Sequence, residues 1–194
     1  MQVAFFKTKF NIFTFTLLWS FTTFSGFFLS LFLIEIGEKP DVGMLEAVVG
    51  GLAIALPQSY ILRQTIFPFG WILSTVLGWV LITAIGAGTI GWYVPSTELL
   101  TFRIVFGIIS GGIGGLVIGV AQWWLAIPSS LHWGWSWMFL NSAIWALALP
   151  VGSIIGIFLR RFTQLFLGEV VGLAITWLIV GVLTGITAYK LFRS

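Results

Sequence analysis

The chain has 194 residues, of which 59% are hydrophobic and 8% are charged, and its formal net charge is +3 at pH 7. About a quarter of the residues of a soluble domain are charged, so this composition excludes a soluble globular protein. The small net charge argues against nucleic-acid binding, and the absence of cysteine excludes disulfides and thiolate chemistry.

Six apolar segments follow one another along the chain, and they predict an all-α integral membrane domain of six transmembrane helices over residues 1–194. The first helix is expected over residues 10–36, a first hairpin over 43–93, a second over 104–159 and the last helix over 167–189. Six crossings place both termini on one side, and a small excess of Lys and Arg there favours the cytoplasm. Eleven tryptophans, many of them near segment ends, are expected to form aromatic belts at the interfaces.

The segment from Arg103 to Ile127 carries a glycine at every fourth position of its middle part. These glycines are Gly107, Gly111, Gly115 and Gly119. In water each interior glycine costs a helix about 1 kcal/mol relative to alanine, whereas in lipid a bare face lets a neighbouring backbone approach closely. This segment is therefore expected to be the central packing element.

The same design occurs 64 residues earlier, which predicts a tandem repeat of a two-helix hairpin. The stretch GGLAIALPQ, which ends at Gln58, aligns without a gap on GGLVIGVAQ, which ends at Gln122, and Trp71 then aligns with Trp135. The packing positions are Gly51 and Ala55 in the first copy, Gly115 and Gly119 in the second, and Gly181 and Gly185 in a half-length third copy.

Gln58 and Gln122 are the polar pair that the repeat retains. A carboxamide near a helix end can hydrogen-bond a neighbouring helix, and such bonds hold transmembrane helices together. The same two amides could instead line a ligand or pigment pocket. Asn141 is a third candidate, because it interrupts the apolar pattern of its helix together with Pro150 and could face a cavity.

Glu46, Arg103 and Glu169 lie near the same end of three predicted helices that run in one direction. If these helices are adjacent, the two carboxylates could flank the guanidinium as interfacial ion pairs. The alternative is a functional carboxylate at depth, such as a proton relay.

The sequence contains no combination of nucleophile, base and acid that would predict an enzyme, and no cluster of metal ligands. His132 is the single histidine, so we expect an interfacial residue and no metal site. The alternative for His132 is an axial ligand to a haem or chlorophyll.

The pattern Gly51-x3-Ala55-x2-Gln58-x3-Leu62-Arg63, followed by Trp71, resembles that of uncharacterised multi-pass membrane proteins of cyanobacteria and related bacteria. In the second copy Ala126-Ile127 stands where the family pattern has Leu-Arg. The resemblance implies a repeated helical hairpin in a bacterial inner or thylakoid membrane, with a thylakoid complex as the partner, and no known activity.

These features together predict a non-enzymatic accessory, assembly or scaffold subunit that contacts membrane lipid and a larger membrane protein complex. A lipid or a pigment such as a carotenoid or chlorophyll could lie between its helices. The alternative is a small transporter or channel, which usually requires polar groups near the midplane of the membrane. Asn141 and Pro150 are the residues that could supply such a site.

Overall fold

A computed structural model describes residues 10–38, 42–85 and 90–193, and this part of the chain is all-helical. Its six helices are α1 (Ile12–Ser30), α2 (Met44–Leu62), α3 (Pro68–Ala84), α4 (Leu100–Leu125), α5 (Ser136–Thr163) and α6 (Leu167–Arg193). All except α3 are long and apolar enough to cross a membrane. The 17 residues of α3 extend about 26 Å at 1.5 Å per residue, slightly less than a hydrocarbon core of about 30 Å.

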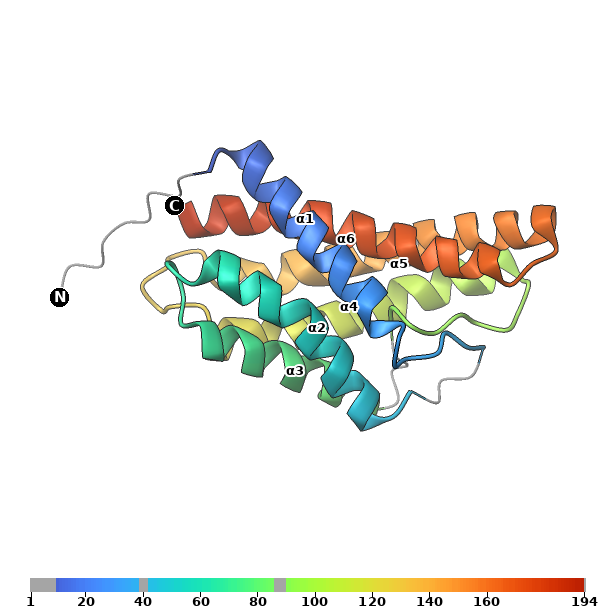
Figure 1. Cartoon of the computed structure of the whole chain (residues 1–194), viewed down its shortest axis with the longest axis horizontal. Helices are drawn as coiled ribbons and strands as arrows, with labels where there is room; N and C mark the ends of the chain where they lie inside the picture. Colours follow the sequence, from blue (N-terminus) through green and yellow to red (C-terminus); the bar gives the residue numbers. More distant parts are fainter. Residues whose placement is uncertain (1–9, 39–41, 86–89, 194) are drawn as a thin grey trace.

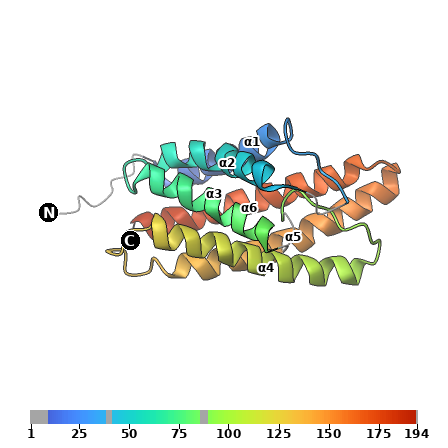
Figure 2. The ribbon, with the colours of Figure 1, turned by 90° about the horizontal axis from the view of Figure 1, so that it is seen from below.

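The six helices form a closed ring in the described part of the chain. Each helix packs against the helices before and after it, and α6 returns to pack against α1 (Figures 1 and 2). In Figure 1, α1 runs obliquely across α6 and beside α2, while α4, α5 and α6 extend further than the shorter helices at the end where α6 begins. This ring order decides which side chains can meet.

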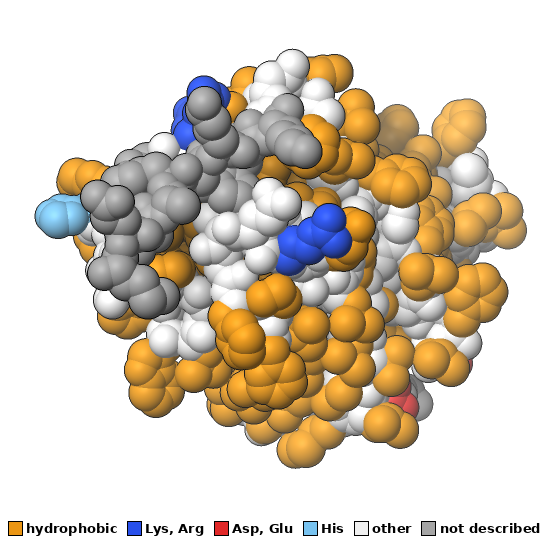
Figure 3. All heavy atoms as spheres, turned by 60° about the vertical axis from the view of Figure 1, so that its left-hand side comes forward, with side chains coloured by type: hydrophobic (Ala, Val, Ile, Leu, Met, Phe, Trp, Pro, Cys, Tyr) orange, Lys and Arg blue, Asp and Glu red, His pale blue; other side chains and the backbone are white. Residues whose placement is uncertain are grey.

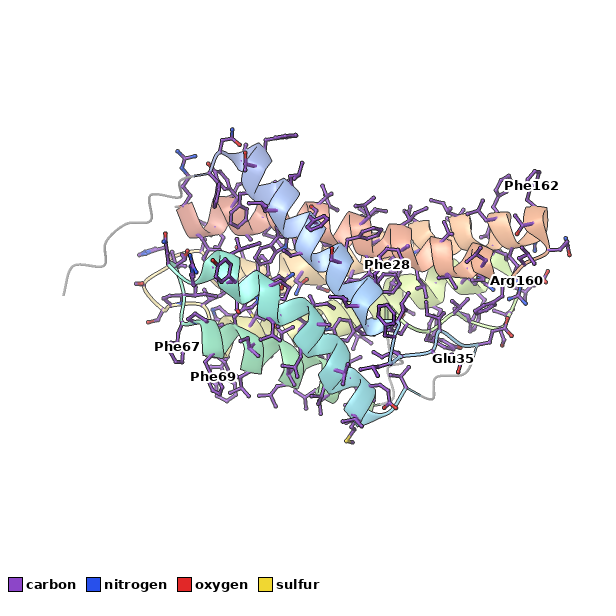
Figure 4. All side chains as sticks on the ribbon, in the orientation of Figure 1. Phe28, Glu35, Phe67, Phe69, Arg160 and Phe162 are labelled. Atoms are coloured by element: carbon purple, nitrogen blue, oxygen red, sulfur yellow. The ribbon has the colours of Figure 1, made fainter. Side chains whose placement is uncertain are left out.

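The two ends of the ring differ in character. We call the end where α4 and α6 begin the charged end, because Arg160 and Glu35 lie there, whereas Phe67 and Phe69 lie at the opposite end (Figure 4). At the opposite end α1 begins and α6 terminates (Figure 1). Viewed with that end turned forward, the surface is mostly hydrophobic with isolated basic side chains (Figure 3).

The helix boundaries correct several expected ranges. The first helix covers Ile12–Ser30 and not residues 10–36. The second helix of the first hairpin ends at Ala84 and not at residue 93. Residues 86–89 of that expected helix lie outside the described part, and Gly91 has a left-handed φ of 103° that no helix continues through. The second hairpin extends over Leu100–Thr163, and the last helix continues to Arg193.

The glycine face of α4 lies directly against the backbone of α5. A Cβ atom added at Gly111 would lie 2.5 Å from the carbonyl oxygen of Trp145, and one at Gly115 would lie 2.7 Å from that of Asn141. Added Cβ atoms at the other two glycines of this face would also meet α5: the one at Gly107 would contact Pro150, and the one at Gly119 would contact Met138. The bare face therefore allows two backbones to pack where any side chain would separate them.

The glycines of α2 and α6 face the next helix of the ring in the same way. An added Cβ at Gly51 would lie 3.2 Å from the Cα of Val76 in α3, and one at Gly181 would lie 3.1 Å from the Cα of Ser20 in α1. Ala55, the other small position of α2, is fully buried, and Gly185 of α6 faces Trp19 of α1. Small residues thus line three helix contacts, and the third closes the ring.

Tryptophan rings fill the interior of the ring. Near the charged end, the centroid of Trp79 lies 4.8 Å from that of Trp92, 5.7 Å from that of Trp145 and 5.7 Å from that of Trp177. In a second layer Trp71 lies 5.7 Å from Trp19 and 5.8 Å from Trp137. The expected aromatic belt is therefore limited to the four exposed tryptophans, which are Trp123, Trp124, Trp133 and Trp135.

Candidate functional site

Gln122 joins three helices through its carboxamide. Its Nε2 donates to Oγ1 of Thr75 in α3 over 2.9 Å, and its Oε1 accepts from Nε1 of Trp137 in α5 over 2.7 Å. The side chain is buried, and both ends of the amide are used. Gln122 therefore acts as a cross-link between α3, α4 and α5.

Gln58 makes the equivalent contacts one hairpin earlier. Its Nε2 donates to Oγ1 of Thr23 in α1 over 2.8 Å, and its Oε1 accepts from Nε1 of Trp71 in α3 over 3.1 Å. Both glutamines thus bind neighbouring helices, as the packing interpretation predicts.

The tryptophan that bonds to Gln122 is not the one that the sequence alignment pairs with Trp71. A constant offset of 64 assigns this place to Trp135, but Trp135 is 46% exposed. Trp137, which follows Trp71 by 66 residues, occupies it. The offset of 64 holds for the glutamines and fails after the connection between α4 and α5, because the spacing from the glutamine to its tryptophan is 15 residues in the second hairpin and 13 in the first.

Asn141 faces a small central cavity between the two tryptophan layers. The side chains that line the cavity are all buried, and they include Gln58, Gln122, Asn141 and Thr184. Its volume is about 40 Å³, which is enough for two or three water molecules at 10–15 Å³ each. In the described part of the chain no protein group hydrogen-bonds the carboxamide of Asn141, so waters are its natural partners.

The main charged site lies at the charged end, where Arg103 of α4 pairs with Glu169 of α6. Nη1 of Arg103 donates to Oε1 and Oε2 of Glu169 over 2.9 and 2.8 Å, and Nε donates to the carbonyl oxygen of Thr97 over 2.6 Å. The two residues are only 1% and 2% exposed. Because α5 lies between α4 and α6 in the ring, this pair joins two helices that are not neighbours.

Glu46 does not take part in this pair. It lies in a surface hollow with Glu35, Glu38 and Arg160, and its helix α2 packs against α1 and α3. The expectation that both carboxylates flank Arg103 is therefore wrong for Glu46. Arg160 of α5 instead approaches Glu169 as a second cation, with its Nη1 3.7 Å from Oε1 of Glu169 and in contact with Glu38.

A second cavity, the Arg103 cavity, lies beside the ion pair. It is lined by the α3–α4 connection and by α4, α5 and α6, with a volume of about 30 Å³. Two polar atoms in its wall, Nη2 of Arg103 and Oγ of Ser153, are buried without a hydrogen-bond partner. Buried polar groups are nearly always paired, so two orphaned donors at one cavity mark a candidate binding site.

Tyr93 also lines this cavity, from the connection between α3 and α4. Burial raises the pKa of its hydroxyl above the ordinary value of 10, and the nearby positive charge of Arg103 opposes this shift. The hydroxyl is therefore protonated at neutral pH and can donate a hydrogen bond.

His132 lies far from both cavities. It is exposed beside Trp124 and Trp135 in a surface hollow formed by the α4–α5 connection. This position agrees with an interfacial residue.

The residues that the sequence analysis missed are the partners of the expected ones. Thr23 and Thr75 each follow a buried tryptophan by four residues, in the pattern Trp-x3-Thr. Asn141, which the sequence analysis did single out, follows Trp137 by the same spacing. That pattern would have revealed the hydrogen-bonded layer. Ser153 and Tyr93 leave no comparable trace, because single hydroxyls in apolar segments are common.

No family model, curated protein or solved structure matches the chain. The fold itself defines the class: an all-helical chain in which five helices are long and apolar enough to span a bilayer, which indicates an integral membrane protein.

Proposed function

We propose that this chain is a non-enzymatic accessory or assembly subunit of a larger membrane complex and that it binds lipid between its helices. The observation that carries the proposal is the interior of the ring, which is filled apart from two small cavities of about 40 and 30 Å³. Indole rings occupy its centre, and the two glutamines are fully engaged by neighbouring helices. Such an interior supports a rigid helical body better than a pathway for a substrate.

The ring has the organisation of three related hairpins, and this is part of the proposal. The hairpins α2–α3 and α4–α5 share the glutamine contacts and the glycine face. The third hairpin is formed by the last and the first helices, because Gly181 and Gly185 of α6 face α1. There Nε1 of Trp19 donates to Oγ1 of Thr184 over 3.0 Å, in place of the glutamine contact.

The outer surface supports a subunit role, because it offers large apolar side chains over much of its area. Phe13, Trp124 and Phe162 are 72%, 77% and 81% exposed. Lipid covers such side chains in any membrane protein, and contiguous apolar surface is also where partner helices dock.

The test is the size and composition of the native assembly. The full chain with an affinity tag is expressed in its own membrane, solubilised in a mild detergent, and separated by native electrophoresis and mass spectrometry. We expect a defined complex with a stoichiometric partner, and the Gly115→Leu variant, which disrupts the α4–α5 contact, should lose it. A chain that is recovered only alone or with itself contradicts the subunit role.

A transporter is the second candidate, and the unpartnered amide of Asn141 in the central cavity is the observation that favours it. Transport through this cavity requires a wet route to both sides of the membrane. Proteoliposomes containing the wild-type chain or the Asn141→Leu variant separate the two candidates. A solute or ion flux that the variant abolishes supports the transporter, and equal leakage of both supports the subunit.

A further inference from the structure

We propose that the Arg103 cavity binds the carboxylate of a long-chain amphiphile such as a fatty acid, with the chain lying along α4. The inference names the ligand class for the lipid binding proposed above, and so it rests on that proposal. It is carried by the two buried donors without partners and by the shape of the cavity around them.

The guanidinium of Arg103 is held in place before any ligand arrives. Nε donates to the carbonyl oxygen of Thr97, and Nη1 donates to both carboxylate oxygens of Glu169. The two N–H groups of Nη2 therefore remain for a ligand, and Nη2 has no partner in the protein. A ligand that binds there loses little affinity to the ordering of this side chain.

Ser153 supplies a further donor from α5. Its Oγ is buried, has no partner and lines the same cavity as Nη2 of Arg103. Most serines and threonines in these helices bond to their own backbone, as Ser110 does to the carbonyl oxygen of Phe106 over 2.6 Å. An acceptor with two oxygens satisfies both Nη2 and Ser153, and a carboxylate is the common group with this geometry.

The charges around the cavity leave the Nη2 side of Arg103 open to an acceptor. Glu169 is on the Nη1 side of the guanidinium and is shared with Arg160, 3.7 Å away. Arg160 also contacts Glu38, so the two arginines and the two glutamates balance one another. Glu169, which bonds to Nη1, is the one carboxylate among the residues that line the cavity.

The size of the cavity selects a small head group. About 30 Å³ accommodates roughly two water molecules, which is comparable with the three heavy atoms of a carboxylate and smaller than a phosphodiester with its glycerol. The half-buried residues of its wall are Tyr93, Phe106 and Ser153. The ring centroids of Tyr93 and Phe106 are 5.9 Å apart, and we place the mouth beside these two rings. Phe106 stacks on Phe102, which is 53% exposed, and this leads an alkyl chain from the mouth to the lipid-facing side of α4.

The experiment is equilibrium binding of radiolabelled palmitate to the purified full chain in dodecyl maltoside. We expect saturable binding of about one palmitate per chain. Methyl palmitate, which has the same chain and no charge, and acetate, which has the head group alone, should each compete at least about tenfold more weakly, because a charge-assisted bidentate contact contributes more than 1.4 kcal/mol. Phosphatidylglycerol is the third competitor, and it tests whether the cavity binds a phosphate head group.

Two variants link the binding to the site. Ser153→Ala and Arg103→Lys should each weaken palmitate binding about tenfold or more, because each removes a donor while Arg103→Lys keeps the charge beside Glu169. Ser142→Ala is the matched control, since Ser142 is also in α5 but donates to the carbonyl oxygen of Gly112 over 2.7 Å, away from the cavity. Its affinity should equal that of the wild type.

The proposal is overturned if palmitate does not bind, if methyl palmitate or phosphatidylglycerol binds as tightly as palmitate, or if Ser153→Ala binds like the wild type. The Ser153→Ala result decides alone if Arg103→Lys does not fold. None of these results bears on the size of the native complex, so failure of the ligand and failure of the subunit role are separate outcomes.

Discussion

The contact between Gln122 and Trp137 gives the sharpest test of the helix register. Nε1 of Trp137 donates to Oε1 of Gln122 over 2.7 Å, and the two residues are 2% and 4% exposed. Because this bond is buried and joins two helices, Gln122→Leu and Trp137→Phe should each destabilise the fold. Interhelical hydrogen bonds in membranes average about 0.6 kcal/mol and reach about 1.7 kcal/mol, so we expect about 2 kcal/mol for Gln122→Leu, which loses two of them.

The informative quantity is the coupling between the two changes. In a double-mutant cycle, Gln122→Leu and Trp137→Phe should show a coupling energy of about 1 kcal/mol, because either change alone already removes their shared bond. The matched cycle uses Trp135→Phe, at the position that a constant offset of 64 assigns to this contact. Its coupling with Gln122→Leu should be below about 0.3 kcal/mol.

The assay is reversible unfolding of the purified chain in mixed micelles of dodecyl maltoside and sodium dodecyl sulfate, followed by circular dichroism. The free energy of unfolding is measured for the wild type, the three single variants and the two double variants. A coupling at Trp135 as large as that at Trp137 would refute the register described here.

Glycine packing, the buried ion pair and the raised pKa of Tyr93 each give one further prediction, measured by the same unfolding assay. Gly115→Ala should cost about 1–3 kcal/mol by overpacking against the α5 backbone, whereas Gly112→Ala, whose added Cβ would meet its nearest neighbour at 3.8 Å, should be neutral or stabilising by up to about 1 kcal/mol. Glu169→Gln should cost about 3–5 kcal/mol because it leaves Arg103 buried without a counter-charge, and Glu98→Gln, in a pair whose side chains are 59% and 69% exposed, should cost less than about 1 kcal/mol. Because the pKa of Tyr93 is raised in the fold, the protonated hydroxyl contributes its full stabilisation below pH 10, and this stabilisation is lost as the pH rises above 10. The free energy of unfolding of Tyr93→Phe should therefore fall less steeply above pH 10 than that of the wild type. The same pH dependence in both proteins would contradict the shift.

The membrane class and the small-residue faces could be read from the sequence because they depend on one helix at a time. An uninterrupted apolar run specifies a spanning helix whatever its neighbours are. The spacing of Gly107, Gly111, Gly115 and Gly119 likewise defines a face without reference to the partner. The identity of the partner, α5, needed the structure.

The tryptophans were misjudged because hydropathy does not distinguish an indole at the interface from one inside a bundle. An indole needs a partner for its N–H, and the membrane interface usually provides it. Here the partners are inside: Gln58 for Trp71, Gln122 for Trp137 and the carbonyl oxygen of Gly91 for Trp177. Internal acceptors from distant segments cannot be found from local sequence.

The charged end was predicted in part for a related reason. Glu46, Arg103 and Glu169 have the same position on three parallel helices, so the sequence could not decide between the two carboxylates. The order of the helices in the ring does not decide either, because α3 separates α2 from α4 as α5 separates α6 from α4. The side-chain contacts decide: Glu169 bonds to Arg103, whereas Glu46 lies in the surface hollow with Glu38 and Arg160. Arg160 at the end of α5 completes the contact from the intervening helix.

The position of this pair explains why the Arg103 cavity can persist in a bundle that is otherwise closely packed. Between α5 and α6, an added Cβ at Gly172 would lie 2.7 Å from the Cα of Gly156, and the α4–α5 contact is equally close. Such faces would let the three long helices close over any free volume. Because the guanidinium is fixed between Thr97 and Glu169, α4 is held to α6 at a set distance across α5. A buried ion pair adds little net stability compared with apolar packing, but it does define geometry. In this ring it fixes the separation of α4 and α6 and keeps two hydrogen-bond donors directed into the space between them.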